Sequence, residues 1–307
     1  MPASRIRYAR LATERENSKS RALDRMTPGA IAALMNREDR RAVAAVGRVR
    51  REIAAAVKLV VAALAQGGRL FFVGAGTSGR LGVIEAAECP PTFGTPPRLV
   101  QAIIAGGHGA VFRSREGAED DGRAARRAVR RRVRRGDVVV GISASGVTPF
   151  VRAGLAAARG QGAATVLVAC NAEGARGARS AASLRVVPLT GPEVLAGSTR
   201  LKAGTATKLV LNTITTAAMT GLGRVYGNRM IDLQPRSAKL YERALRLVTD
   251  LGGVSRDRAR AALKASHGRV RVAIVMAKSG GNAIEAARAL AAAGGALRVA
   301  LQKPRRK

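Results

Sequence analysis

The stretch VGAGTSGRLGVIEAAECPPTFG, from Val73 to Gly94, decides the fold. It overlaps an apolar run, RLFFVGA at residues 69–75, which is typical of a buried strand. The glycine-rich turn after that run predicts a helix beginning near Ser78. The Cys-Pro-Pro triplet that follows Glu88 removes two backbone donors, so we expect the helix to end there. A strand, a tight turn and a helix in this order indicate an α/β protein.

The same alternation continues along the chain. Further apolar runs, separated by helical segments, predict strands over 98–107, 137–146, 164–170 and 183–189. Continuous apolar strands between helices indicate a doubly wound parallel sheet with helices on both faces.

The segments outside the sheet divide the chain into three parts. We expect residues 1–25 to form an arm, because they lack a periodic apolar pattern. Residues 26–236 form the sheet domain, which opens with two helices between Thr27 and Gly68. Residues 237–307 form a small helical module, in which three short helices are joined at glycines.

Composition excludes several classes of protein. The chain has 307 residues, of which 47% are hydrophobic and 3% aromatic, enough apolar material for a core. No apolar run is long enough for a membrane span, and the first residues lack the apolar segment of a secretory signal. Cys89 and Cys170 form no CxxC pair, and His108 and His267 are far apart, so we expect no metal site and a cytoplasmic protein.

The net charge of +34 raises the question of a nucleic-acid partner. The basic residues are spread along the chain, as a coding bias toward arginine would produce. The densest run, residues 126–135, has helical spacing and no interleaved aromatic residues, unlike a platform for single strands. We therefore expect no specific nucleic-acid partner.

The first glycine turn, Gly74–Gly79, fits the G-x-G-x-x-G pattern of dinucleotide-binding sites. That pattern also needs a carboxylate after the next strand, and the sequence there is IIAGGHG. The variable positions instead carry the hydroxyls of Thr77 and Ser78. Hydroxyls and backbone amides at a helix start suit a terminal phosphate monoester.

A second turn, within GISASGVTP at residues 141–149, lies at the end of the strand predicted over 137–146. Each such turn alone is more often a helix cap than a binding site. Two of them on one parallel sheet favour a phosphate site made of uncharged donors. The donors that we predict in this second turn are Ser143, Ser145, Gly146 and Thr148.

These motifs resemble the SIS (sugar isomerase) phosphosugar-binding fold and, at closer range, the N-acetylmuramic acid 6-phosphate etherase family. The stretches that carry the resemblance are GAGTSGRLGVIEAAECPPTFG, EGAED, GISASGVTPF and, over residues 193–233, EVLAGSTRLKAGTATKLVLNTITTAAMTGLGRVYGNRMIDL. TERENSKSRALDRM at 13–26 is similar to the family's N-terminal segment. The resemblance covers nearly the whole chain and implies a lyase of cell-wall amino sugar recycling, which removes D-lactate from the C3 ether with water. Such chemistry needs an acid and a base but no metal or redox cofactor.

The resemblance implies Glu88 and Glu119 as the catalytic carboxylates. Glu88 is expected at a helix C-terminus, where the negative pole holds a proton and suits a general acid. Glu119 is expected in the first turn of the next helix, where the anion is favoured and suits a base.

A third donor-rich segment, GSTRLKAGTATK, supplies Ser198 as a further binding residue. Lys202 either faces the substrate or is exposed, and Glu193 is a candidate ligand for sugar hydroxyls. Val147 and Phe150 stand where the family usually shows Arg and Tyr, which leaves the choice of sugar open.

Ser78 and Glu88 lie ten residues apart on one predicted helix, about 15 Å at 1.5 Å per residue. A hexose 6-phosphate spans roughly half of that distance between phosphorus and C3. We therefore predict a homodimer in which Glu88 serves the partner's site. Three other functions stay open: a non-catalytic phosphosugar-binding regulator, a DNA-binding regulator with a sugar-phosphate domain, and a nicotinamide enzyme.

Overall fold

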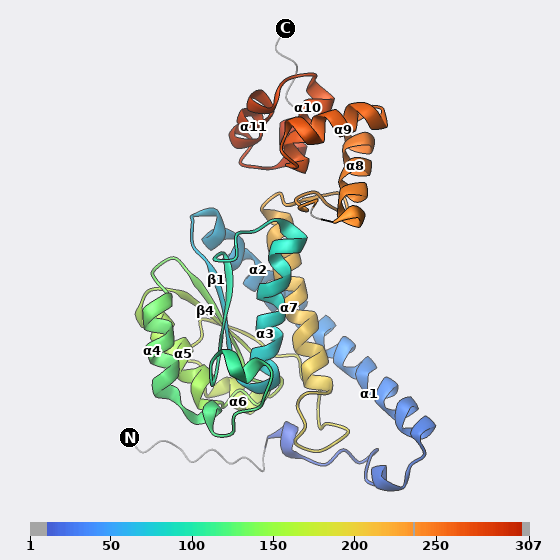
Figure 1. The fold of residues 1–307 in the computed structure, drawn as a ribbon. Helices are drawn as coiled ribbons and strands as arrows, with labels where there is room; N and C mark the ends of the chain where they lie inside the picture. Colours follow the sequence, from blue (N-terminus) through green and yellow to red (C-terminus); the bar gives the residue numbers. More distant parts are fainter. Residues whose placement is uncertain (1–10, 236, 303–307) are drawn as a thin grey trace. The chain divides into compact units, whose positions relative to one another are not determined.

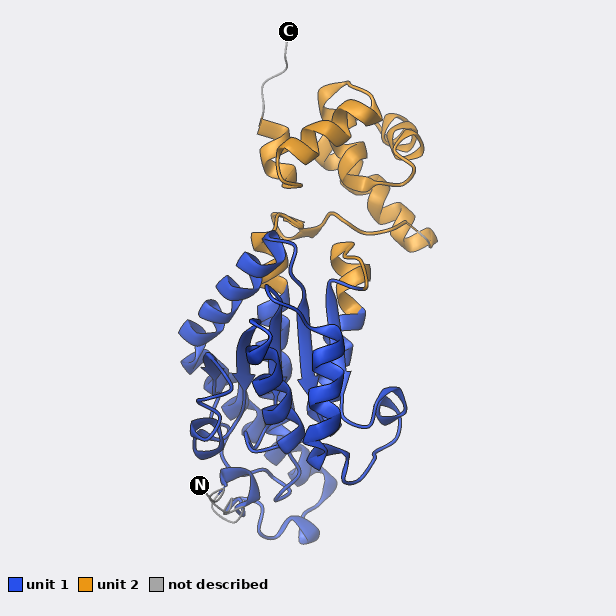
Figure 2. Cartoon of the chain, turned by 90° about the vertical axis from the view of Figure 1, so that its left-hand side faces the viewer, with its two compact units in different colours: residues 1–87, 98–215 blue, residues 88–97, 216–307 orange. Residues whose placement is uncertain are grey.

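The computed structural model describes residues 11–235 and 237–302 (Figure 1). Contacts divide the chain into two compact units (Figure 2). Unit 1 comprises residues 1–87 and 98–215, and unit 2 comprises residues 88–97 and 216–307. Among the described residues, no helix is long and apolar enough to cross a membrane.

Unit 1 is built on the predicted parallel sheet, and all five strands are confirmed. The strand order is β2-β1-β3-β4-β5, so β1 pairs with both β2 and β3. The strands are shorter than predicted because their turns begin sooner. Their bounds are β1 Leu70–Gly74, β2 Val100–Ile104, β3 Val138–Ile142, β4 Ala164–Val168 and β5 Leu184–Val186.

Helices cover both faces of this sheet, as predicted. On one face, Phe71 and Val73 of β1 share a core with α4 (Gly122–Arg132) and α5 (Pro149–Gly160). On the other face, Phe72 lies against Gly82 of α3 (Gly76–Phe93), where a Cβ would meet the phenyl ring. Because successive side chains of a strand point to opposite faces, both sets must be apolar, which explains the continuous apolar runs.

The helix α3 corrects one prediction. It does not end at Glu88 but continues through both prolines to Phe93. Proline removes only its own N–H, and the residues after it can still donate to preceding carbonyls. The Gly94 amide does so, bonding the Pro90 carbonyl at 3.0 Å.

The two predicted N-terminal helices are present as α1 (Pro28–Arg48) and α2 (Arg50–Ala65). Thr27 caps α1 by accepting a hydrogen bond from the Ala30 amide, and Pro28 occupies the first helical position. Leu34, Ala42 and Ala45 lie on the buried side of α1.

The described part of the predicted arm packs onto unit 1. It contains two short 3₁₀ turns, η2 (Ala12–Glu14) and η3 (Leu23–Arg25). The side chains of Leu11, Thr13 and Asn17 are buried, although the sequence of this segment has no periodic pattern that predicts their burial. Residues 1–10 of the arm lie outside the described residues.

The remaining elements of unit 1 surround the carboxyl ends of the strands. Sequence periodicity missed α6, which is only five residues long. These elements are η4 (His108–Val111), η5 (Ala118–Asp120), α6 (Ala172–Arg176) and most of α7 (Lys202–Gly221).

Unit 2 contains the three predicted short helices and four elements that were not predicted. The missed elements are a hairpin of β6 (Val225–Tyr226) and β7 (Arg229–Met230), and the helices α8 (Ala238–Gly252) and α12 (Leu297–Gln302). The predicted helices are α9 (Arg256–Ala265), α10 (Val270–Ser279) and α11 (Ala283–Ala292).

Unit 2 begins earlier than the expected boundary at 236/237. The Asp232 carboxylate pairs with Arg224 before the hairpin and with Arg271 in α10. Arg224 also donates to the Phe93 carbonyl at 3.4 Å, which ties the end of α3 to this unit. These contacts join the segment before residue 237 to the helices after it.

Candidate functional site

The strand order places the two predicted turns side by side. The chain passes from β1 to β2 on one side of the sheet and then to β3 on the other, so the direction of winding reverses between β1 and β3. Gly74, the last residue of β1, is in register with Ile142, the last residue of β3. In open parallel sheets, ligands bind in the crevice outside the carboxyl ends of the strands at such a reversal.

The second turn forms a cluster of hydroxyls. The Ser143 Oγ lies 2.8 Å from the Thr148 Oγ1 and 3.4 Å from the Ser145 Oγ. It also accepts a hydrogen bond from the Gly146 amide at 3.0 Å, and Gly146 has a φ of +74° that favours glycine. The Ser145 and Thr148 side chains are half-buried, so the cluster remains open to solvent.

Helix capping does not account for this cluster. Thr148 occupies the N-cap position of α5, but its side chain makes no capping hydrogen bond and instead contacts Ser143. The hydroxyls therefore bond to one another, leaving the α5 amides uncapped by this residue.

In the first turn, the backbone at the end of β1 lies close to the backbone at the start of α3. A Cβ on Gly74 or Gly79 would overlap the other residue's backbone, so both positions require glycine. Gly76 begins α3 with a φ of +51°. Thr77 and Ser78 follow in the first turn of α3 and are half-buried.

The start of α7 joins the same edge of the sheet. Gly204 in its first turn faces the Thr77 side chain, since a Cβ there would lie 3.8 Å from the Thr77 methyl group. The Ala203 carbonyl accepts from the Cys170 thiol, just beyond β4, at 3.8 Å. Ser198 lies half-buried in the loop that leads into α7. Thr77, Ser78 and the hydroxyl cluster thus lie near the beginning of a third helix.

Glu193 binds the backbone of this helix. Its carboxylate is fully buried and accepts from the amides of Lys202 and Ala203, at 3.0 and 2.9 Å. Burial raises the pKa of Glu193 above its ordinary value, and the two amides and the Lys202 charge oppose that effect. Glu193 therefore satisfies amides at the helix start, while its predicted contact with sugar hydroxyls stays a prediction.

Lys202 is buried, which excludes the predicted alternative that it is exposed. Its ammonium donates to the Glu38 carboxylate of α1 at 2.6 Å, and both side chains are 1% exposed. Asn17 donates to the same carboxylate at 2.8 Å and to the Pro192 carbonyl at 3.3 Å. The N-terminal segment, α1 and the loop before α7 therefore meet in one buried polar network.

Charges and hydrogen bonds in this network act on Glu38 against desolvation. Burial raises the pKa of Glu38, but the hydrogen bonds from Lys202 and Asn17 and the charges of Lys202 and Arg41 outweigh it. The net pKa lies below its ordinary value of 4.5, so Glu38 is an anion at neutral pH.

The two cysteines are free and buried. Burial is the main cause that raises the pKa of Cys170 to about 12, so its thiol stays protonated at neutral pH. Cys89 lies on α3 and is 2% exposed.

Glu119 does not lie in the first turn of the next helix. It is exposed in the separate turn η5, and Asp121 caps α4 by accepting from the Ala124 amide at 2.8 Å. The turn η5 packs against α5, and Gly122 lies close to Pro149 and Ala153. Glu119 is therefore carried beside the helix that begins at the hydroxyl cluster.

Glu88 is exposed on α3 and is separated from the end of that helix by five residues. The macrodipole acts mainly within the last turn, so the predicted bias toward a held proton loses its basis. Because Glu119 lies in η5 and not in the first turn of α4, its predicted bias toward the anion also loses its basis. Glu88 and Ser78 share one continuous helix, ten residues apart, as the dimer argument assumed.

Sequence analysis missed two residues near these turns. Glu85, one turn before Glu88, is buried and accepts from Asn212 and Thr215 of α7, at 2.5 and 2.7 Å. Arg152 donates to two carbonyls beside the hydroxyl cluster. An isolated charged residue in a helical pattern gives no signal for either role.

Curated relatives match this chain over most of its length. A protein from Gloeobacter violaceus is 52% identical over 96% of both chains, and one from Picosynechococcus is 48% identical over 95% of this chain and 97% of its own. A third, from Geobacillus thermodenitrificans, is 52% identical over 87% of this chain and 90% of its own. All three are named N-acetylmuramic acid 6-phosphate etherase. This chain belongs to the N-acetylmuramic acid 6-phosphate etherase family.

Two family models match separate parts of this etherase family member, one mostly within unit 1 and one within unit 2. Residues 52–159 match the N-terminal SIS domain of glucokinase regulatory protein, and residues 227–289 match the C-terminal lid domain of the same protein. The SIS-type α/β fold predicted from the sequence is confirmed. Among solved structures, a phosphoheptose isomerase from Neisseria gonorrhoeae aligns with 62% of this chain and 97% of its own at 20% identity. The TM-score of this alignment is 0.47.

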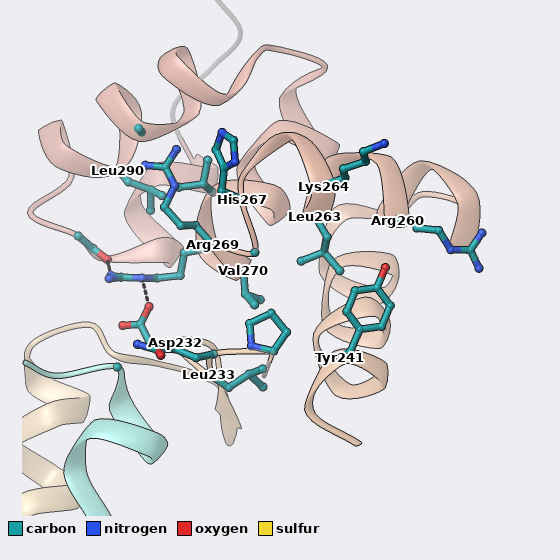
Figure 3. A pocket seen from close by; sticks show the side chains of 18 of the residues that line it. Asp232, Leu233, Tyr241, Arg260, Leu263, Lys264, His267, Arg269, Val270 and Leu290 are labelled. Atoms are coloured by element: carbon teal, nitrogen blue, oxygen red, sulfur yellow. Dashed lines mark hydrogen bonds and ion pairs between the residues drawn. The ribbon is translucent and has the colours of Figure 1, made fainter. Parts of the chain in front are cut away.

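Unit 2 of this etherase family member holds a cavity of about 1120 Å³ (Figure 3). Leu233, Tyr241 and Leu263 lie along it, and the ion pair of Asp232 and Arg271 is at one end. None of the predicted site residues lines this cavity. Within the described ranges, no three His, Cys, Asp or Glu side chains are grouped to hold a metal ion.

Proposed function

We propose that this protein cleaves the D-lactyl ether of N-acetylmuramic acid 6-phosphate with water, giving N-acetylglucosamine 6-phosphate and D-lactate. The names of relatives about half identical over most of the chain support this assignment. One structural observation carries it: two hydroxyl-bearing turns adjoin at the winding reversal of the sheet, with Glu119 beside the second. This arrangement suits a sugar phosphate better than a dinucleotide.

The 6-phosphate is held by uncharged donors in this proposal. The hydroxyls of Ser143, Ser145 and Thr148 and the amides of the turn at Gly146 supply one side of the site. Thr77 and Ser78 supply the other side, at the positive end of α3. Ser198, in the loop before α7, contacts the sugar. Lys202 does not contact it, but stabilises the start of α7 through its bond to Glu38.

The reaction proceeds by elimination and hydration. In the open-chain sugar, the C1 aldehyde acidifies the C2 proton, and a carboxylate removes it. The C2 electrons form a C2–C3 double bond, the bond from C3 to the ether oxygen breaks, and a carboxylic acid protonates that oxygen to release D-lactate. Water then adds its hydroxyl to C3 and a proton returns to C2. We assign Glu88 and Glu119 to these transfers as a pair.

The separation of Glu88 from Ser78 along α3 supports a composite site. One sugar phosphate cannot reach both on a continuous helix, because ten residues extend about 15 Å. We propose a homodimer in which Glu88 of one subunit acts on the sugar bound by the other. Because Cys89 and Cys170 are both free thiols, we place the protein in the cytoplasm.

Release of D-lactate from N-acetylmuramic acid 6-phosphate tests this function. We expect Glu88→Gln and Glu119→Gln each to lower the rate by about 10²–10⁴-fold, the usual worth of a general acid or base. Glu116→Gln is the matched control, because Glu116 is an exposed carboxylate three residues from Glu119. In heavy-oxygen water, label should enter C3 of the amino sugar. Binding of the sugar phosphate without lactate release would instead favour the regulator.

A further inference from the structure

Arg152 reaches back from α5 to the turn that begins this helix. Its Nε donates to the Gly146 carbonyl and its Nη2 to the Gly174 carbonyl of α6, both at 3.0 Å. A planar guanidinium can bridge two acceptors in this way, whereas an ammonium presents a single point charge. Arg152 therefore joins the hydroxyl-bearing turn to α6.

This contact fixes the direction of one peptide group. In a trans peptide, the carbonyl and the N–H point in opposite directions. Because the Gly146 carbonyl faces Arg152, the Val147 N–H faces the other way, where it donates to the Ser145 Oγ at 3.3 Å. Arg152 thus turns an amide donor toward the hydroxyl cluster. A charge-assisted bond to the carbonyl also polarises this peptide and strengthens its N–H as a donor.

Besides Arg152, the Ser145 hydroxyl holds this peptide by accepting from the Val147 amide at 3.3 Å. Gly146 has a φ of +74° and no side chain, and its backbone lies against Gly174 and Ala175 of α6. Val147 and Phe150, by contrast, are 5% and 2% exposed, and neither supplies a charge. If the peptide rotated, the Gly146 carbonyl oxygen would face the hydroxyl cluster, and its partial negative charge would repel a bound anion.

We propose that Arg152 is a positioning residue for the phosphate of the substrate: it fixes the Gly146–Val147 peptide, whose N–H holds the Ser145 hydroxyl in place, and adds its positive charge behind the turn. This inference rests on the proposed function, because it names the same phosphate site. It predicts that loss of Arg152 weakens binding of the anion and leaves the proton transfers at C2 and C3 unchanged.

The test compares steady-state kinetics of Arg152→Met with those of Arg159→Met. Arg159 lies two turns further along α5 and also donates to a carbonyl, that of Ser180, at 2.8 Å. We expect the KM for N-acetylmuramic acid 6-phosphate to rise about tenfold or more in Arg152→Met, as loss of a hydrogen bond to a charged group implies, with kcat within about twofold of wild type. Inhibition by inorganic phosphate should weaken by the same factor. Arg159→Met should keep both constants.

Three results would overturn the proposal. They are an unchanged KM in Arg152→Met, an equal rise in Arg159→Met, and a fall in kcat with KM constant. If Arg152→Met does not fold, Arg152→Lys decides, because it keeps the charge but cannot bridge both carbonyls. Its KM should rise at least about threefold, and a wild-type KM would exclude the positioning role. Should wild type release no lactate, the proposed function fails, and binding of inorganic phosphate to the same variants still tests Arg152.

Discussion

The buried ion pair of Lys202 and Glu38 joins the start of α7 to α1. Both side chains are 1% exposed, and desolvating two charges costs several kcal/mol unless they are well bonded. Here the ammonium lies 2.6 Å from the carboxylate, and Asn17 donates to the same oxygen. Removing Lys202 therefore leaves the buried Glu38 carboxylate without its nearest cation, with Arg41 at 3.3 Å from the other oxygen.

We predict that Lys202→Met lowers the free energy of unfolding at pH 7 by about 3–5 kcal/mol, the usual cost of breaking a buried ion pair. Arg21→Ala is the control, because Arg21 and Glu16 are 73% and 79% exposed and should contribute roughly 0–1 kcal/mol. Denaturant titration of both variants measures these values.

The same pair predicts a pH dependence with a definite sign. The pKa of Glu38 is lowered in the folded protein, so its contribution is present above the ordinary value of 4.5 and is lost as the pH falls through the folded pKa. The difference in unfolding free energy between wild type and Lys202→Met should therefore narrow below about pH 4.5. A difference that stays constant down to pH 3 would show that Glu38 is not the ionised partner.

Among the elements, the five-residue helix α6 packs directly against the turn that carries the hydroxyl cluster. Asn171 caps it by accepting from the amides of Glu173 and Gly174, at 3.0 and 3.1 Å. Gly174 then lies so close to the turn that a Cβ would overlap the Ser145 carbonyl oxygen. The backbone of α6 therefore limits the positions that the turn of the hydroxyl cluster can adopt.

We predict that Gly174→Ala displaces the turn, raising the KM for the phosphosugar and costing about 1–3 kcal/mol of stability, as overpacking does. No functional group is removed, so kcat should change less than KM. Gly160→Ala is the control on α5, because a Cβ there meets nothing within 4 Å. It should leave KM unchanged. Equal KM values for the two variants would show that α6 does not shape the site.

The elements also show where sequence reasoning succeeds and where it fails. Long apolar runs predicted all five strands, since burial on both faces leaves a continuous signal. The extension of α3 past Glu88 was missed because the rule for proline concerns its own amide, not the amides that follow. Glu88 and Glu119 were predicted from a resemblance, and their catalytic roles stay a prediction. The strand order that brings β1 beside β3 depends on long-range pairing, which local sequence does not encode. The bond from Lys202 to Glu38 spans 164 positions, which no local pattern encodes.

At the scale of the whole molecule, the net charge of +34 favours anionic ligands in general. The two hydroxyl turns carry no cation of their own, so the proposed phosphate site relies on the surrounding field and on Arg152 for positive charge. A field of this kind raises association rates and weakens with salt, whereas hydrogen bonds from the turns do not depend on salt in the same way. The proposed function therefore assigns specificity for the sugar phosphate to the turns.

The composite site predicts complementation between inactive variants. Glu88→Gln removes a catalytic carboxylate, and a variant with both Ser143→Ala and Ser145→Ala removes phosphate donors. If Glu88 acts across a two-fold dimer, a mixed dimer has one site that lacks both features and one intact site. Since half of the dimers in an equimolar mixture are mixed, subunit exchange should restore about a quarter of wild-type lactate release. If Glu88 and the hydroxyls act within one subunit, every site in the mixture stays defective. Activity that remains at the level of the separate variants, after exchange is demonstrated with differently tagged chains, would therefore exclude the shared site.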